Sequence, residues 1–363
     1  MRTAFGLNWR SPSLELHEFF RPGCTGASTS LGRPGLGFQA GGLPRQPVID
    51  VVEADPAHWP PLPPGAHDTA FVTMGLAELR LNVEGIGQFR VWGGHTIAWS
   101  RCHPQVGDQD LRTFLLSSAV GALLIQRGLL VLHGNALVKD GKAIVCLGHS
   151  GAGKSTLAYA LMRQGWQLLA DDLVAITSDG RVLPGIPRIK LWEDAAVAFG
   201  LVPSQLQPVR QGLRKYLISG SAIDLAPQPV PLQSIYFIHR QRHGISAGHC
   251  AGEANGVGNG VGHGVVHGVG NGQSICLLPS QQQAALRLRN HAFRPRFVRG
   301  LGQEGANFIA LARLQRSTRL ASLAVPLGIP AMARWLETVD LLSAANSAAQ
   351  GNASSSKVLA EVS

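Results

Sequence analysis

Apolar and polar residues alternate with a period of two along much of residues 71–99, the pattern of strands with one buried face. The runs at 79–83 and 88–92 are separated by Gly85 and Gly87, as expected for antiparallel strands joined by a tight turn. Residues 110–127 instead carry apolar residues at helical spacing, and this pattern stops at Gly128. The sequence therefore predicts a β-rich region followed by one long helix.

A second set of apolar runs predicts an α/β domain. Helices are expected at 156–164, closed by Gly165, and through most of 281–342. A proline-punctuated segment, 183–192, interrupts the pattern. The expected strands are short and mostly apolar, as buried strands are, at 129–132, 142–147, 168–170 and 234–238.

Three stretches lack such periodicity. Residues 1–65 are rich in Pro, Gly and Ser and are expected to be poorly ordered, and the Ala/Ser-rich tail should fray. Residues 244–272 repeat Gly, Val, His and Asn, which favours a flexible insertion over a metal site built from His249, His263 and His267. The predicted organisation is a poorly ordered segment at 1–65, strands plus a helix at 66–127, an α/β domain at 128–342 and a flexible tail at 343–363.

A glycine-rich motif of the form G-x-x-x-x-G-K-[ST] follows the apolar run 142–147 directly. Its glycines let backbone N–H groups turn inward on a polyphosphate, and the start of the next helix adds its positive dipole end. The lysine would contact the β- and γ-phosphates, and the serine hydroxyl would bind Mg²⁺. A glycine turn could fit the motif by chance, but the strand before it and the helix after it favour nucleotide binding. The candidate residues are Gly148, His149, Ser150, Gly151, Ala152, Gly153, Lys154, Ser155 and Thr156.

Two adjacent acidic residues, Asp171 and Asp172, interrupt the apolar run 168–176. A carboxylate at the end of a strand beside a phosphate loop is where a magnesium ligand or a catalytic base belongs. The alternative is a solvated acidic turn, but burial within an apolar run costs free energy unless a metal or substrate compensates. His133 follows the apolar run 129–132, and its residue type alone leaves a functional and a structural role equally open.

Composition narrows the classes of partner. The formal net charge is +10, but the positive residues are scattered and form no dense basic block, which argues against a nucleic-acid partner. The five cysteines include no C-x-x-C pair, so neither a disulfide framework nor a zinc knuckle is expected. No apolar run reaches the length of about 18 residues that a membrane span needs, and no signal-peptide core is recognisable. The expected location is the cytoplasm.

The segments 132–134, 148–158 and 163–173 together resemble the catalytic domain of HPr serine kinase/phosphorylase. The likeness is greatest to the HPr-kinase-like branch, some members of which act in lasso peptide tailoring. It is specific over residues 128–195 and diffuse to about 340, and residues 1–120 do not look like that enzyme's regulatory domain. The resemblance implies an α/β fold with a P-loop kinase core of the HPr-kinase type, a mixed sheet flanked by helices, preceded by a small β-rich N-terminal region.

The resemblance also implies roles for individual residues. Lys154 would bind phosphate, Ser155 would bind Mg²⁺, and Asp172 would accept the proton of the attacking serine hydroxyl. Asp171 would support the metal or a water molecule, and His133 would belong to the active site.

Two departures from the family's pattern stand out. Glu193 matches the family's second metal-binding carboxylate only loosely, and the loop linked to phosphorylase activity is not recognisable, so dephosphorylation is expected to be slow. Two basic pairs remain ambiguous between substrate contacts and ordinary surface charges: Arg188 with Lys190, and Arg214 with Lys215.

The hypothesis that follows is an ATP- and Mg²⁺-dependent kinase that phosphorylates a serine hydroxyl of a peptide or protein. The alternatives are a small-molecule kinase and a nucleotide-binding module that transfers no phosphate. The carboxylate pair is more than nucleotide binding requires, which favours transfer. Oligomeric state stays open, with a homo-oligomer as one option.

Overall fold

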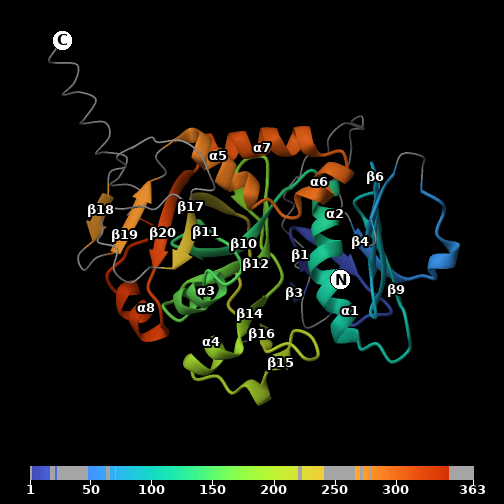
Figure 1. The fold of residues 1–363 in the computed structure, drawn as a ribbon, viewed down its shortest axis with the longest axis horizontal. Helices are drawn as coiled ribbons and strands as arrows, with labels where there is room; N and C mark the ends of the chain where they lie inside the picture. The colour runs from blue at the N-terminus through green and yellow to red at the C-terminus, as the bar shows by residue number, and fades with distance from the viewer. Residues whose placement is uncertain are drawn as a thin grey trace, which may run out of the picture.

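The computed structural model describes residues 2–16, 21–22, 48–62, 66–69, 71–219, 223–240, 266–269, 273–277 and 280–342. It shows a mixed α/β fold in which a large mixed sheet is flanked by helices and preceded by a β-rich N-terminal part (Figure 1). The predicted fold class is confirmed at this level. No helix among the described residues is long and apolar enough to cross a bilayer.

The N-terminal sheet has nine strands in the order β3-β1-β2-β4-β9-β8-β7-β6-β5. The predicted antiparallel hairpins are present from β6 to β9, whereas β4 pairs in parallel with both β2 and β9. A short 3-10 helix, η2 (Pro56–His58), follows β4. The strands are β1 (Arg2–Ala4), β2 (Leu7–Arg10), β3 (Arg21–Pro22), β4 (Val48–Glu53), β5 (His67–Asp68), β6 (Val72–Gly75), β7 (Glu78–Val83), β8 (Gly87–Trp92) and β9 (Thr96–Arg101).

Strands therefore occur within residues 1–65, where loop was expected. Leu7, Ile49 and Val51 are fully buried, so these strands belong to the core. Their parallel pairing joins segments that are distant in the sequence, a feature that local periodicity does not record. Residues 17–20, 23–47 and 63–65 of that stretch lie outside the described residues, as do residues 244–265 and 270–272 of the glycine-rich insertion and the tail from residue 343.

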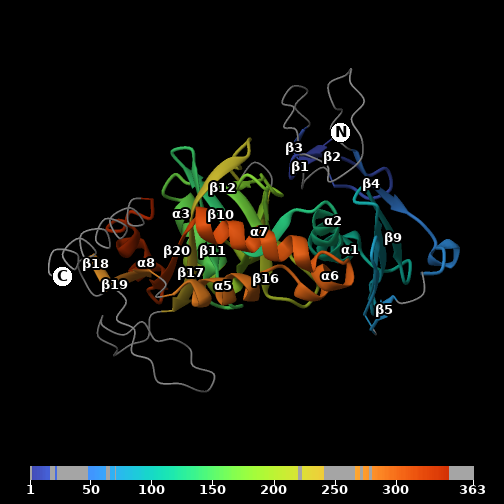
Figure 2. The same cartoon turned by 90° about the horizontal axis from the view of Figure 1, so that it is seen from above.

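The predicted long helix is continuous over three pieces: α1 (Asp108–Phe114), a π-helical stretch η3 (Leu115–Ala119) and α2 (Val120–Gln126). It ends as expected at Gly128, whose φ is +74°. The Gln126 side chain ties α2 to the N-terminal sheet, because its Nε2 donates to Val91 O at 2.9 Å and its Oε1 accepts from Gly94 N at 3.0 Å. In both views the helix lies between strands β4 and β9 of the N-terminal sheet and the C-terminal part of the molecule (Figures 1 and 2).

The second sheet has the strand order β11-β10-β12-β13-β17-β20-β19-β18, and β11 also pairs with β17. The pairs β11–β17 and β17–β20 are parallel, and the other pairs are antiparallel. The strands are β10 (Leu130–Lys139), β11 (Lys142–Leu147), β12 (Gln167–Ile176), β13 (Arg181–Val182), β17 (Val230–Arg240), β18 (Val266–Val269), β19 (Gln273–Leu277) and β20 (Arg319–Val325).

Helices cover both faces of this sheet. On one face, α3 (Lys154–Met162) and α8 (Ile329–Leu336) pack on alternate residues of β10, β11 and β17, including Leu137, Ile144 and Tyr236. On the other face, α5 (Gln281–Asn290) and α7 (Glu304–Ser317) pack on the intervening residues of the same strands, such as Val138 and Val145. The short helix α6 (Pro295–Gly300) lies between α5 and α7 in the sequence. The C-terminal part was expected to be helical through most of residues 281–342, but β20 interrupts it. A short apolar run in a largely buried strand has no period that separates it from a buried helix.

A small antiparallel sheet packs beside β12 and α3, with the order β14-β16-β15. It consists of β14 (Arg188–Trp192), β15 (Gln207–Pro208) and β16 (Lys215–Ser219), with α4 (Glu193–Ala198) and the 3-10 helix η4 (Pro203–Gln205) between the first two. Ile189 and Leu191 join the core under α3, so Arg188, Lys190 and Trp192 lie on the opposite face of β14. The proline-punctuated segment thus ends in a strand that carries basic residues on one side.

Candidate active site

The glycine-rich motif forms the predicted strand, loop and helix, from β11 through residues 148–153 into α3. Gly151 and Gly153 have φ values of +80° and +93°, a region that disfavours other residues. Gly148 is required for a different reason: a Cβ atom there would lie 2.7 Å from the backbone oxygen of Ile238 on β17. The loop is therefore shaped by glycine at both ends.

The lysine of the motif is held against its own loop. Lys154 Nζ donates to Gly148 O at 2.7 Å and to His149 O at 3.1 Å. Burial lowers the pKa of Lys154, while the charges of Asp172 and Asp171 act in the opposite direction. The ammonium thus interacts with both the loop and the two carboxylates.

Strand register places the carboxylate pair beside this loop. On β10, Gly134 pairs with Leu147, the last residue before the loop, and on its other side with Asp172 of β12. Neighbouring strands lie about 4.8 Å apart, so Asp172 is about 10 Å from the strand end that leads into the loop. Asp171 and Asp172 lie in the middle of β12, not at a strand end as expected, and the interpretation as a solvated acidic turn is wrong. Asp172 has a φ of +68°, a strained value for a non-glycine residue.

Asp171 accepts hydrogen bonds on both carboxylate oxygens. Oδ1 accepts from the Nδ2 of Asn135, which is 1% exposed, and Oδ2 accepts from the backbone N of Lys190 at 3.1 Å. Burial raises the pKa of Asp171, and the neighbouring charge of Asp172 raises it further. Asn135 was not identified from the sequence, although a polar residue inside the apolar stretch 130–138 is the signal that could have revealed it.

Asp172 is an ion-pair partner. Its Oδ2 accepts from Lys190 Nζ, and its backbone oxygen lies 3.2 Å from His133 Nδ1. Burial works against the charged form of Asp172, but the charge and hydrogen bond of Lys190 outweigh it, so the pKa of Asp172 is lowered. The two carboxylates are therefore electrostatically different.

His291, which was not identified from the sequence, lies beside the glycine loop. The His133 backbone N donates to His291 O at 2.8 Å, and the rings of His291 and His149 have centroids 5.6 Å apart. Burial lowers the pKa of His291 to about 4, and the nearby His149 and Lys154 contribute to the shift. His291 follows α5, so only the tertiary fold brings it to the loop.

Positive side chains surround the carboxylates. Arg188 and Lys190 are 4% and 7% exposed, which excludes the interpretation of this pair as surface charges. Arg188 donates to Leu116 O at 3.2 Å, and Lys190 pairs with Asp172. Of the second basic pair, Arg214 is exposed and pairs with Glu193, whereas Lys215 acts electrostatically on Lys154 and both carboxylates.

Of the three candidate metal ligands, Glu193 has partners away from the carboxylate pair. Ser155, in the first turn of α3, and Asp171 supply the hard oxygen atoms that Mg²⁺ prefers. Glu193 instead accepts from Tyr216 OH at 3.3 Å and pairs with Arg214 at 3.2 Å. Within the described ranges, no group of three or more His, Cys, Asp or Glu residues is placed to hold a metal ion. Ser155 and Asp171 therefore offer oxygen donors of the kind that Mg²⁺ prefers, without a third acidic ligand beside them among the described residues.

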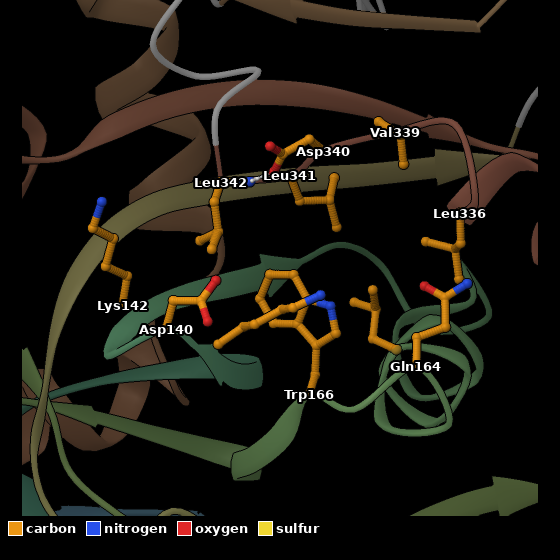
Figure 3. Close-up of a pocket in the computed structure, with 11 residues that line it drawn as sticks. Asp140, Lys142, Gln164, Trp166, Leu336, Val339, Asp340, Leu341 and Leu342 are labelled. Carbon is orange, nitrogen blue, oxygen red and sulfur yellow. Dashed lines mark hydrogen bonds between the residues drawn. The ribbon is translucent and has the colours of Figure 1, made fainter.

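A separate cavity of about 410 Å³ lies where β11 begins and α3 ends, at the ends of these elements that are far from the glycine loop (Figure 3). Trp166, Asp140 and Lys142 line it together with the segment of Leu341 and Leu342. Because β11 begins at Lys142 and reaches the loop only at Leu147, this cavity is remote from the carboxylate pair.

Comparison with known proteins gives only one weak structural match. No family model matches the chain, and no curated protein matches it. Among solved structures, the chain is similar to the HPr(Ser) kinase/phosphatase from Coxiella burnetii, with 21% sequence identity and a TM-score of 0.14. The match covers 30% of this chain and 63% of that one, less than two thirds of its length. A TM-score this low carries no weight for fold or function, so both rest on the residues described above.

Proposed function

We propose that this protein is a Mg²⁺-dependent kinase that transfers the γ-phosphoryl group of ATP to a serine hydroxyl of a peptide or protein. The observation that carries the proposal is the strand register that sets the carboxylate pair of β12 beside the glycine loop, with one strand between them. Phosphoryl transfer needs these two parts together: a cradle for the phosphates and a group that orients and deprotonates the hydroxyl.

The loop supplies the nucleotide site. Backbone N–H groups of residues 148–153 and the start of α3 would hold the β- and γ-phosphates, and Lys154 would exchange its two loop carbonyls for phosphate oxygens. The Mg²⁺ ion, when bound through Ser155 and whichever carboxylate is not the base, supplies charge neutralisation on the phosphates. Lys190 and Lys215 are placed to add positive charge on the side of the carboxylates.

Either carboxylate could receive the proton of the acceptor hydroxyl. The family resemblance assigns this role to Asp172 and leaves metal or water positioning to Asp171. The electrostatics of the site favour the reverse, because a base works best when its pKa lies near the working pH. The pKa of Asp171 is raised, whereas that of Asp172 is lowered by Lys190. His133, bonded to the backbone of Asp172, would help to hold the strained residue in place.

Phosphorylation of peptides tests the proposal directly. The protein is incubated with ATP, Mg²⁺ and candidate serine peptides, and mass spectrometry records the addition of phosphate. A matched pair of variants provides the controls: Lys154→Ala should abolish transfer, and Lys142→Ala, at the far end of β11, should not. Transfer to nucleosides or sugars but to no peptide would support the small-molecule alternative. Nucleotide binding without transfer to any acceptor would support the regulatory module and contradict the proposal.

A further inference from the structure

The Trp192 side chain is exposed and belongs to none of the hydrophobic clusters formed by the described residues. Its exposed fraction is 46%, and it is the last residue of β14. A single exposed apolar side chain is ordinary in a protein surface. The location sets Trp192 apart, because it lies two residues beyond Lys190 on the same face of the strand, and Lys190 contacts Asp172.

Lys215 completes a small platform with this tryptophan. The two residues are cross-strand partners in β14 and β16, and Lys215 Nζ lies 5.3 Å from the centroid of the indole ring. Lys215 forms no ion pair with any side chain in the described part of the chain. Lys190, by contrast, is paired with Asp172, and Lys154 donates to loop carbonyls. Among the described residues, Lys215 thus acts on the two carboxylates without a salt bridge to either, and its ammonium lies beside an aromatic face.

The position of the platform fits the acceptor better than the nucleotide. The hydroxyl that is phosphorylated must reach the carboxylate pair, so its carrier must lie near Lys190. Two strand residues span about 7 Å, and so do two residues of an extended peptide. A residue next to the target serine could therefore rest on Trp192 while the serine reaches the carboxylates.

We infer that Trp192 and Lys215 form an acceptor subsite for an acidic peptide, with an apolar or aromatic side chain on the indole and a carboxylate on the Lys215 ammonium. This inference rests on the proposed kinase function and narrows its acceptor to peptides with an acidic residue within one or two positions of the serine. A cation–π pair that already holds Lys215 over the ring presents both contacts in a fixed arrangement.

Peptide binding, measured separately from phosphoryl transfer, tests the subsite. Three fluorescent serine peptides, acetylated and amidated at their ends, carry Glu and Phe, Lys and Phe, or Glu and Ala beside the serine. Anisotropy is read with the β,γ-imido analogue of ATP and Mg²⁺ present. The wild type should bind the Glu/Phe peptide about 10-fold more tightly than the Lys/Phe peptide. Trp192→Ala should remove the preference for Phe over Ala and weaken binding about 10-fold.

Reversing the charge of Lys215 gives the most discriminating test in this binding assay. Lys215→Glu should invert the preference to the Lys/Phe peptide, whereas the matched reversal Lys142→Glu, at the other end of β11, should not. The affinity for the ATP analogue should change less than about 2-fold in Trp192→Ala. The inference is overturned if the wild type shows no preference, if both reversals act alike, or if Lys215→Glu weakens only the ATP analogue. A preserved binding preference without any phosphate on the peptide would instead reject the kinase function and leave the acidic-peptide subsite standing.

Discussion

At the scale of single residues, the candidate active site is a set of opposed charges whose pKa values are shifted by their neighbours. Asp171 is half-buried between Asn135 and the backbone of Lys190, while Asp172 is held ionised by the Lys190 ammonium. The sequence shows two adjacent acids and nothing to tell them apart. The difference comes from which face of β14 carries Lys190, and only the tertiary structure supplies that.

The two carboxylates can be separated by isosteric substitution. Asparagine keeps the shape of aspartate but cannot accept the hydroxyl proton, so the variant of the true base should lose about 10²–10⁴-fold in single-turnover rate while ATP binding is kept. Because the pKa of Asp171 is raised and that of Asp172 is lowered, we expect the larger loss in Asp171→Asn; a larger loss in Asp172→Asn would show that Asp172 is the base. In the wild type, the rate should rise with pH as the base loses its proton. Rates equal to wild type in both variants would exclude the pair from proton transfer.

His291 gives a pH dependence of stability with a definite sign. Its pKa falls from 6.5 to about 4 on folding, so the unfolded chain binds more protons than the folded chain between these values. The folded state is therefore stabilised above pH 6.5 and loses this contribution as the pH falls towards 4. Partial exposure should reduce the loss to about 1 kcal/mol. Urea unfolding at pH 7 and pH 4.5 should show a smaller pH effect in His291→Gln than in wild type; equal effects would contradict the assignment.

At the scale of elements, the patterns that depend on neighbouring residues were predictable, and those that depend on distant pairing were not. The hairpins from β6 to β9, the long helix before Gly128 and the loop between β11 and α3 all follow from local periodicity and glycine placement. The parallel strands β2 and β4, the buried strand β20 and the position of the acids within β12 do not. In each of these cases a distant strand decides the conformation, and no local signal reports that strand.

Gly148 shows how an element contact constrains the loop. A Cβ atom there would lie 2.7 Å from Ile238 O on β17, and the parallel pairing of β11 with β17 leaves little room for movement. Gly148→Ala should therefore cost about 1–3 kcal/mol of unfolding free energy and weaken nucleotide binding. Gly107→Ala is the matched control, because its φ is −70° and a Cβ there meets nothing within 4 Å. Urea denaturation of both variants measures the difference. Equal stabilities would show that β17 moves enough to accommodate the added Cβ atom.

At the scale of the whole molecule, the N-terminal sheet and the α/β core share one hydrophobic cluster. The cluster contains Trp99 and Leu115 from the N-terminal part together with Leu173 and Leu183 from the core, all of them buried. Phe5 adds a backbone hydrogen bond to Pro184 O at 2.6 Å. The predicted boundary near residue 128 therefore passes through a continuous interior, and we propose that the two parts unfold as one unit.

Truncation at that boundary tests this coupling. Removing residues 1–127 would expose core side chains that now pack on the N-terminal part: Val131, Leu173, Ala175, Leu183, Ile186, Phe293 and Phe297. Full burial of one large apolar side chain contributes about 1.5–3 kcal/mol, and a domain is stable by only about 5–15 kcal/mol in total. Even partial exposure of these side chains should therefore unfold the fragment.

We expect one calorimetric transition for the full chain, and for residues 128–342 alone no cooperative transition and no phosphoryl transfer. Two separate transitions in the full chain, or an active and cooperatively folded fragment, would show that the core is autonomous and that the shared cluster is only an interface between two domains.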